Sequence, residues 1–253
     1  MKFACLLPLF AALVCAIFTP AAFAQLTPVN DKGVTMGHIH LIVPDIEAHK
    51  KLWVDTFGAQ VSHAGALELI KLPGIIILLT KGKPVTSGEP VADHFAFLVR
   101  DLAAMKIKLA AANIQVGDDS IAKLPDGVRM ELIEDKGLKV PMAFHHYHIF
   151  SADTGLSNWY MQHFGVVFPA GPNFPGGEMR FSTQANREPT KGYVFDHIGF
   201  EIKGLPEFCK KLEADGIKLD MGIIDAPQIG LRVTFVTDPV GTRIELTEGL
   251  AGK

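Results

Sequence analysis

The chain has 253 residues, of which 48% are apolar and 20% are charged, a composition typical of a well-packed globular protein. This excludes a disordered chain, a collagen and a protein made only of membrane spans. Its 24 lysines and arginines against 27 acidic residues give a formal net charge of −3, with no long basic run. The sequence therefore does not predict a nucleic-acid-binding surface, and a small molecule is the expected partner.

The first 24 residues have the pattern of a secretory signal peptide. A lysine at position 2 precedes an apolar run, and Ala22-Phe23-Ala24 supplies a small-residue cleavage site. Pro8 and Pro20 interrupt the stretch of about 20 apolar residues that a spanning helix needs. We therefore expect cleavage near Ala24, export to the periplasm or the medium, and no stable membrane anchor. Cys209 is then the remaining cysteine, and we expect it to be a small buried side chain.

The rest of the chain repeats itself. The segment "HIHLIVPD" (38–45) is similar to "HYHIFSAD" (146–153), "DHFAFLVRDL" (93–102) to "DHIGFEIKGL" (196–205), and "GVRMEL" (127–132) to "GTRIEL" (241–246). A repeat of about 100–115 residues is far longer than a solenoid unit. We predict a leader at 25–35, a first domain at 36–135, a linker at 136–144 and a second domain at 145–249.

Each half is itself doubled. An alternating apolar strand leads into an amphipathic helix and then into several short strands, twice over. In the first half these elements are expected at 39–43, 46–58, 59–63, 66–72 and 74–80, then at 95–99, 101–113 and 128–133, with short strands near 115 and 121. The pattern predicts an α+β fold of two tandem domains, each made of paired βαβββ modules that form a curved mixed sheet.

Histidines and glutamates recur at equivalent places in the two halves. Alternation along a strand directs His38 and His40 to the same face of the sheet. Two histidines and one carboxylate from three strands would hold a divalent ion and leave coordination positions open. We predict a main metal site of His146, His197 and Glu245, and a second site of His38, His94 and Glu131. The alternative is a set of hydrogen-bonded core residues that duplication has preserved.

Several other polar residues accompany these triples. Arg129 and Arg243 precede each glutamate by two residues, where they could meet an anionic substrate or pair with a carboxylate. His40 and His148 share the ligand face and are candidate acid–base groups beside the metal. The other histidines (His49, His63, His145 and His163) are expected to be surface or structural residues. The Gly/Pro-rich segment 169–179 is expected to be an ordinary loop, with a lid as the alternative.

With these motifs the chain resembles the vicinal oxygen chelate superfamily, which includes glyoxalase I, fosfomycin- and bleomycin-resistance proteins and extradiol dioxygenases. The resemblance covers essentially all of the chain after the signal peptide. It rests on the opening strands with His38 and His146, the "H-x-[AG]-F" strands with His94 and His197, and "DPVGTRIEL" with Glu245; "LPDGVRMEL" with Glu131 is a looser match. It implies that paired modules form a half-barrel with the helices outside, and that these residues bind a metal ion inside it.

The chain also departs from particular subfamilies. Glyoxalase I has a fourth ligand, a glutamate on the last strand of its first module, whereas Leu78 and, less surely, Ser182 stand at the nearest positions here. Extradiol dioxygenases have a tyrosine where this chain has Phe235 and an upstream histidine that the stretch 225–230 lacks. The resemblance therefore favours neither glyoxalase I proper nor ring cleavage.

The expected function is that of an exported, metal-dependent lyase or isomerase acting on an oxygen-rich small molecule. The cofactor would be a divalent ion, and export makes Zn(II) or Mn(II) more suitable than labile Fe(II). A metal-independent drug- or metabolite-binding protein of the bleomycin-resistance type is the second interpretation, and an extradiol dioxygenase the third. The sequence leaves a homodimer open.

Overall fold

The computed structural model describes residues 26–168 and 173–253, so the predicted signal peptide lies outside the described residues. The helices of the described chain are α1 (Ile46–Asp55), α2 (Leu102–Ala111), α3 (Leu156–Phe164) and α4 (Leu205–Ala214), with short 3₁₀ turns η1 (Pro125–Gly127) and η2 (Leu250–Gly252). The strands of the first half are β1 (Val34–Val43), β2 (Gln60–Ala64), β3 (Leu67–Leu72), β4 (Ile75–Lys81), β5 (Ala92–Val99), β6 (Ile121–Lys123) and β7 (Arg129–Glu134). Those of the second half are β8 (Met142–Ser151), β9 (Glu178–Thr183), β10 (Phe195–Ile202), β11 (Ile224–Ala226), β12 (Leu231–Thr237) and β13 (Arg243–Glu248).

Local sequence explains where the helices begin and end. The side chain of Asp45 accepts a hydrogen bond from the backbone N–H of Ala48 and caps α1, and Asp101 caps α2 in the same way. Helix α3 ends at Gly165, which has a φ of 77° that a residue without a Cβ adopts at little cost. The end of α3 at Gly165 thus has a conformational reason.

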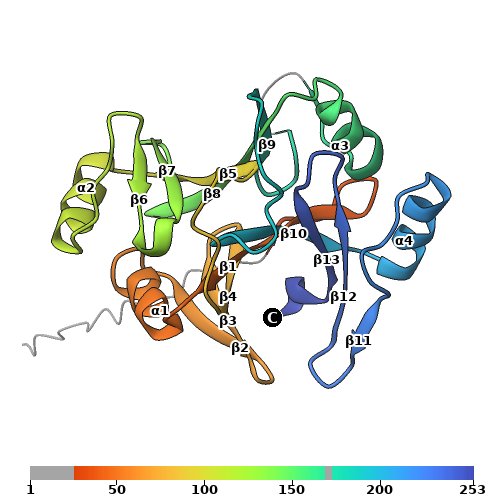
Figure 1. Ribbon diagram of the computed structural model, residues 1–253. Helices are drawn as coiled ribbons and strands as arrows, with labels where there is room; N and C mark the ends of the chain where they lie inside the picture. The colour runs from red at the N-terminus through yellow and green to blue at the C-terminus, as the bar shows by residue number, and fades with distance from the viewer. Residues whose placement is uncertain (1–25, 169–172) are drawn as a thin grey trace, which may run out of the picture.

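The strands form two sheets, with the helices at the periphery (Figure 1). The larger sheet has eight strands in the order β11-β12-β13-β10-β1-β4-β3-β2 and curls into a half-barrel. The smaller sheet has five strands in the order β6-β7-β5-β8-β9. The predicted α+β class with βαβββ-type modules is confirmed.

The way in which the modules pair differs from the expectation. The first module (β1–β4) pairs with the fourth (β10–β13) through antiparallel β1 and β10, and the second pairs with the third through antiparallel β5 and β8. Each sheet therefore combines strands from both predicted domains. The physical reason lies in the connections. The predicted linker at 136–144 holds the short connection 135–141, except for its first residue, and the start of β8, and these lead from β7 into the next module of the same sheet. Strands β1 and β8 also begin within the predicted leader and linker.

The two sheets share one apolar core. The rings of Phe95 on β5 and Phe195 on β10 pack edge to face, with centroids 5.3 Å apart. The buried Tyr147 hydroxyl on β8 donates a 2.6 Å hydrogen bond to the backbone carbonyl of His38 on β1. This bond ties the backbones of the two sheets together beside their histidines.

The described part of the predicted 169–179 loop packs against the protein. Asn173 is buried and exchanges hydrogen bonds with the backbone of Met179, and the carbonyl of Pro175 accepts bonds from Thr35 and Met36. These contacts fit an ordinary loop better than a lid. No helix among the described residues is long and apolar enough to cross a membrane.

Candidate metal centres

One histidine and glutamate group lies in the larger sheet and is called here the larger-sheet site. Its members are His38 and His40 on β1, His197 on β10 and Glu245 on β13. The Glu245 Oε2 atom lies 2.8 Å from Nε2 of His197 and 3.3 Å from Nε2 of His38. Three strands thus bring two imidazoles to one carboxylate oxygen in a buried position.

The second group, the smaller-sheet site, is its counterpart. Its members are His94 on β5, Glu131 on β7, and His146 and His148 on β8. The Glu131 Oε2 atom lies 3.5 Å from Nε2 of His94 and 3.3 Å from Nε2 of His146. The same three-strand arrangement therefore occurs twice.

These distances correct the predicted grouping. His197 does lie with Glu245, and His94 with Glu131, but His38 and His146 exchange places between the two predicted sets. The exchange follows from the pairing of β1 with β10 and of β5 with β8. Each triple therefore takes one histidine from each half of the chain.

Close approach of β1 to β10 depends on a glycine. Gly199 pairs with His38 across the two strands, and a Cβ atom placed on Gly199 would lie 2.1 Å from Nδ1 of His38. No side chain can occupy that space unless the imidazole moves. Ala96 faces His146 at the equivalent place on β5, so the smaller-sheet site leaves room for a methyl group.

An aspartate holds one histidine in each site. The Asp196 carboxylate accepts a 2.5 Å hydrogen bond from Nδ1 of His197, and Asp93 accepts a 2.8 Å bond from Nδ1 of His94. A proton on Nδ1 leaves the Nε2 lone pair free for a metal, an arrangement common among metal-binding histidines. Sequence analysis missed both aspartates, although an Asp-His pair opens each of the repeated "DH" segments.

The candidate acid–base histidines are held by hydroxyl groups. Nε2 of His40 lies 2.7 Å from Oγ1 of Thr80, and Nε2 of His148 lies 2.8 Å from Oγ of Ser182. Both hydroxyls come from the strand that runs parallel to the histidine strand, β4 or β9. The predicted placement of His40 and His148 beside the ligand triples thus agrees with the structure, whereas their catalytic role stays a prediction.

The two sites differ at the position of a fourth ligand. On β10, the residue two positions after His197 is Gly199, and its partner on the neighbouring parallel strand is Glu245. On β1, the residue two positions after His38 is His40, and its partner on the parallel strand β4 is Leu78. Leu78 therefore stands at the position of a fourth ligand. In the smaller sheet the same register leads to Arg180, opposite His148, and the earlier assignment to Ser182 is corrected by two residues. A leucine thus occupies this place in one site and a guanidinium in the other.

The two arginines contact the orienting aspartates instead of the glutamates. Nη1 of Arg243 lies 2.7 Å from Asp196, and its guanidinium stacks on Phe235 at 4.0 Å. Nε of Arg129 lies 3.2 Å from Asp93. The predicted pairing with the neighbouring glutamate is therefore replaced by pairing with an aspartate, and contact with a substrate stays a prediction.

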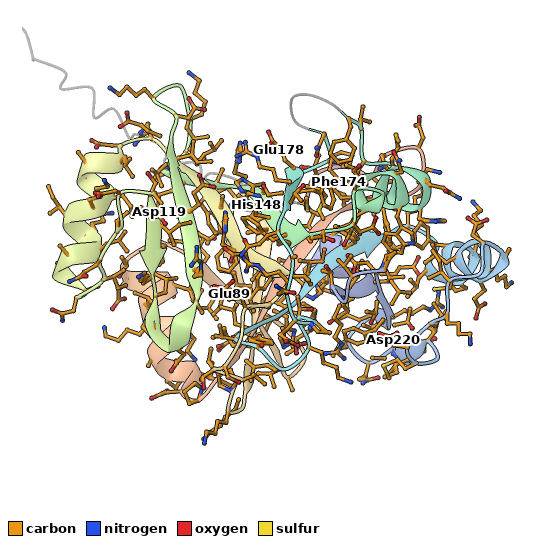
Figure 2. The ribbon with its side chains drawn as sticks, turned by 45° about the horizontal axis from the view of Figure 1, so that its top comes forward. Glu89, Asp119, His148, Phe174, Glu178 and Asp220 are labelled. Atoms are coloured by element: carbon orange, nitrogen blue, oxygen red, sulfur yellow. The ribbon has the colours of Figure 1, made fainter. Side chains whose placement is uncertain are left out.

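His145, which sequence analysis placed among surface or structural residues, contacts the smaller-sheet site. Its Nδ1 atom lies 2.8 Å from Nδ1 of His146, and its Nε2 atom lies 3.6 Å from the Glu178 carboxylate. Figure 2 labels His148 and Glu178, which lie on the neighbouring strands β8 and β9. At the equivalent position of β1 the chain has Gly37, so this contact is specific to the smaller-sheet site.

The remaining histidines lie outside both sites. His49 is buried on α1 and bonds to Asp126 at 2.8 Å, which joins the first module to the second. His63 lies 3.6 Å from Glu68, and His163 lies 3.3 Å from Asp215. Cys209 is buried on α4, and burial raises the pKa of its thiol to about 11, in keeping with an inert side chain.

Electrostatics set the charge state of the ligands in the two sites. Burial opposes charge on Glu245, but the imidazoles of His38 and His197 outweigh it and hold the pKa of its carboxyl well below the usual range. Burial and the nearby Arg180 guanidinium lower the pKa of His146 to about 2. At neutral pH Glu245 is therefore an anion and His146 a neutral imidazole, which are the forms that bind a metal.

Unpaired buried nitrogens give an independent test of whether a metal fits. Nε2 of His38, His94 and His146 are buried without a hydrogen-bond partner in the described part of the chain. A buried polar atom without a partner costs roughly 1–3 kcal/mol. Imidazole nitrogens directed at a carboxylate are the donor set of Zn(II), Mn(II) and Fe(II) sites. The residues present thus fit a divalent ion in both sites.

Comparison with known proteins finds similarity in structure alone. No family model matches the sequence, and no curated protein matches it either. Among solved structures, glyoxalase I from Zea mays has a TM-score of 0.65 and 14% sequence identity, over 85% of this chain and 92% of the maize chain. A putative dioxygenase from Bacillus subtilis has a TM-score of 0.62 and 12% identity, over 90% of this chain and 88% of its own. Similarity at this level identifies the fold, the one that the sequence motifs implied.

Proposed function

Since the chain has the fold of the vicinal oxygen chelate superfamily, we propose that it is a divalent-metal-dependent enzyme whose main site is His38, His197 and Glu245. The main support is that Nε2 of His38 and Nε2 of His197 both lie close to the same buried oxygen of Glu245. In addition, Asp196 accepts a hydrogen bond from Nδ1 of His197 and so fixes its tautomer. The substrate class we infer is an oxygen-rich small molecule, and the reaction class a lyase or isomerase. Both solved structures described above are named as a glyoxalase or a dioxygenase, which supports chemistry of this kind.

A bound divalent ion would supply a Lewis acid that polarises substrate oxygens. The residues of this chain supply the surroundings. His38, His197 and Glu245 would hold the ion, and Asp196 would keep Nε2 of His197 turned toward it. Thr80 holds the ring of His40 beside His197, with ring centroids 4.3 Å apart, so His40 is the group we assign to hydrogen-bond the substrate.

The smaller-sheet site is proposed as the weaker metal site. Arg180 occupies its fourth-ligand position, and this guanidinium also lowers the pKa values of Glu131 and His146. A fixed positive charge near the donor atoms opposes the binding of a second cation. We expect the larger-sheet site to fill first.

Phe235 argues against ring cleavage in this protein. Its ring packs edge-on against His197, with centroids 5.2 Å apart, and lies beneath Arg243. A phenylalanine offers no hydroxyl group for proton transfer at this place. We expect no oxygen consumption with catechols, and oxygen uptake would support the dioxygenase alternative.

Metal analysis of purified variants tests the proposed function and the module pairing together. Protein prepared without chelator should contain one tightly bound divalent ion per chain. His38→Ala and His197→Ala should each lose that ion, whereas His146→Ala should retain it. Loss of the same ion in His146→Ala and His197→Ala would instead support a site within one half of the chain. Failure of the unmodified protein to take up Zn(II), Mn(II) or Fe(II) would overturn the metal-dependent function.

Export is a separate part of the proposal. The signal-peptide pattern of residues 1–24 is its only support, and it lies outside the described residues. Expression of the full chain in a bacterium should yield a periplasmic protein whose first residue is Gln25. A cytoplasmic protein that keeps Met1 would contradict it.

A further inference from the structure

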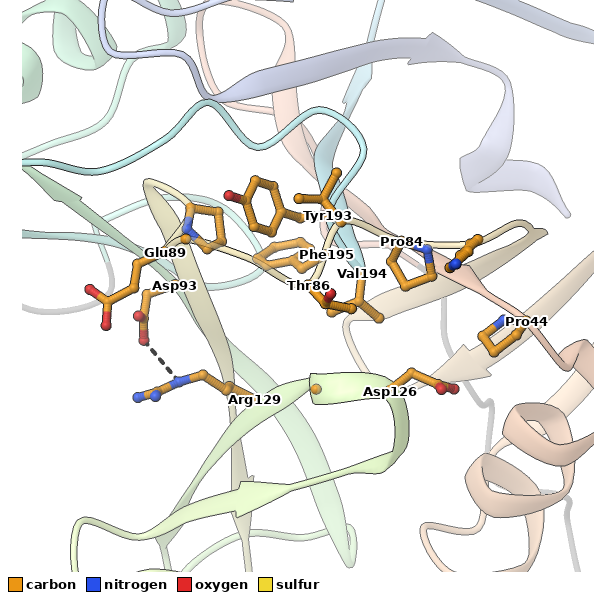
Figure 3. Close-up of a pocket in the computed structure, with 15 residues that line it drawn as sticks. Pro44, Pro84, Thr86, Glu89, Asp93, Asp126, Arg129, Tyr193, Val194 and Phe195 are labelled. Atoms are coloured by element: carbon orange, nitrogen blue, oxygen red, sulfur yellow. Dashed lines mark ion pairs between the residues drawn. The ribbon is translucent and has the colours of Figure 1, made fainter.

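A cavity of about 790 Å³ lies where the connections between modules meet, outside both histidine sites (Figure 3). Its walls come from the segment 83–90, from the start of β10 and from the turn η1 with the start of β7. The two connections that bound it run side by side, since Val85 bridges to Tyr193 and Pro90 to Glu188. A volume of this size suits a molecule as large as a typical metabolite or drug.

The walls are mainly apolar. Tyr193, Val194 and Phe195 form one side of the cavity. In the view of Figure 3 they lie above Arg129 and Asp126. Phe195 and Tyr193 are buried, and the Tyr193 hydroxyl donates a 2.6 Å hydrogen bond to the carbonyl of Ser87. This bond fixes the connection 83–90 against β10, so the aromatic wall is built before any ligand arrives.

The acidic groups on the cavity wall already have partners. Asp93 bonds to His94 and to Arg187, and Asp126 bonds to the buried His49. Glu89 accepts a hydrogen bond from Gln184 and lies 3.7 Å from Arg187. Each carboxylate on the wall thus already has a hydrogen-bond partner in the protein.

The basic side chains on the cavity wall, in contrast, keep hydrogen-bond donors without a partner among the described residues. Arg129 contacts Asp93 through Nε alone, and the described residues offer no hydrogen-bond or ion-pair partner to its two Nη groups. Lys83 likewise has no ion pair in the described part of the chain. Two cations with unused donors beside an apolar wall match the chemistry of an aromatic or aliphatic carboxylate.

The pseudo-equivalent arginine shows that this opening is specific to one half of the fold. Arg243 stacks on Phe235, and 22% of its side chain is exposed, whereas 44% of the Arg129 side chain is exposed. Phe235 pairs with Glu245 across two strands, and the residue that pairs with Glu131 in the same way is Ile121. Arg129 therefore has no aromatic ring at the place where Phe235 supports Arg243. Its guanidinium consequently remains available at the cavity.

We propose that this cavity binds an apolar or aromatic carboxylate, with Arg129 as the group that recognises the acid and Lys83 as a further cation on the wall. Arg129 and Asp93 line the cavity, and Asp93 orients the metal-site histidine His94. A ligand in the cavity would therefore lie next to the residue that holds His94. Binding does not require a metal ion. The proposal is therefore independent of the proposed enzymatic function.

Calorimetric titration of the full protein with 2-naphthoate tests the proposal. We expect saturable binding of one molecule per chain, unchanged after treatment with EDTA. Arg129→Ala should weaken it about tenfold or more, as loss of a charge-assisted bond implies. The matched control Arg243→Ala should change it by about twofold or less. Lys83→Ala should have an intermediate effect.

A neutral analogue separates recognition of the acid from apolar binding. 2-Naphthamide should bind the unmodified protein more weakly than 2-naphthoate, and the difference should disappear in Arg129→Ala. Equal affinities for the two compounds, equal effects of Arg129→Ala and Arg243→Ala, or loss of naphthoate binding in EDTA would each overturn the proposal. Circular dichroism would verify that the variants fold, and Arg129→Gln provides a second variant that keeps the side-chain length.

Discussion

The two histidine sites were built from the same motifs, yet their surroundings differ. The larger-sheet site lies in the middle of eight strands, whereas the smaller sheet has five, and β9 forms its edge. Described residues 165–168 and 173–177 connect α3 to β9 without counterparts of β2 and β3. The Glu131 side chain is 23% exposed and that of Glu245 is 11% exposed. The smaller sheet thus keeps the triple, but its carboxylate is more exposed to water.

A second difference is chemical. The larger-sheet site has Leu78 at the fourth-ligand position, and the smaller-sheet site has Arg180. A neutral side chain leaves the charge of the carboxylate available to a metal ion, whereas a guanidinium partly neutralises it. Two sites with the same three ligands thus differ at the fourth position and in the depth of burial, the features on which their proposed ranking in metal affinity rests.

Removal of the carboxylate should give the largest effect. Glu245→Ala should lose the tightly bound ion and destabilise the fold by about 3 kcal/mol, because two buried imidazoles lose their anionic partner. Glu131→Ala should keep the tight ion and lose less stability, since Glu131 is more exposed. Metal content and urea unfolding of both variants measure this. Equal losses in the two variants would abolish the proposed ranking of the sites.

Removal of an orienting aspartate should have a smaller effect. Asp196→Asn should weaken metal binding at the larger-sheet site about 10- to 100-fold, because the amide no longer stabilises a proton on Nδ1 of His197. Competition with a chromophoric chelator measures this affinity. Asp93→Asn is the matched control and should leave the tight site unchanged. An unchanged affinity in Asp196→Asn would remove Asp196 from the proposed site.

A charge reversal at Arg180 should make the metal affinities of the two sites more similar. Arg180→Glu replaces a guanidinium by a carboxylate at the fourth-ligand position and should strengthen metal binding at the smaller-sheet site by about tenfold. Arg180→Gln removes the positive charge alone and should give an intermediate gain. Titration with Zn(II) after the larger-sheet site is filled would show both. No gain in either variant would contradict the register that equates Arg180 with Leu78.

Loss of a hydroxyl should produce the smallest effect. Thr80→Val removes the hydrogen bond to His40 and should cost about 1 kcal/mol of stability while the metal content stays the same. Ser182→Ala does the same for His148. Thermal unfolding and metal analysis of both variants would measure this. A lost metal ion in Thr80→Val would make His40 a ligand instead of a substrate contact.

Much of the fold could be predicted because the signals are local. The continuous apolar run in 74–80, the aspartate before α1 and the glycine after α3 each indicate an element or its end. The His/Glu motifs likewise indicated which residues face one another within a module. His94 with Glu131 and His197 with Glu245 both follow from parallel strands that a single module contains.

Pairing between modules could not be predicted in the same way. The repeated motifs are similar enough that β1 could match either β5 or β10 by its own pattern of apolar residues. The route of the connections decides which module pairs with which. Neither the short segment 135–141 nor the paired segments near Val85 and Tyr193 carries a sequence signal for this pairing. Arg180 was missed for a related reason, because its equivalence to Leu78 depends on the register of β9 against β8.

The antiparallel pairing of β1 with β10 also sets the order in which the protein can mature. His38 belongs to the first described strand, while His197 and Glu245 belong to the last quarter of the chain, so the larger-sheet site cannot assemble until synthesis is almost complete. Contacts of such long sequence separation form slowly, since a large loop must close first. The smaller sheet, whose strands lie between residues 92 and 183, can form earlier. A chain that stops before β10 would therefore contain every member of the smaller-sheet site but would lack His197 and Glu245 of the larger-sheet site.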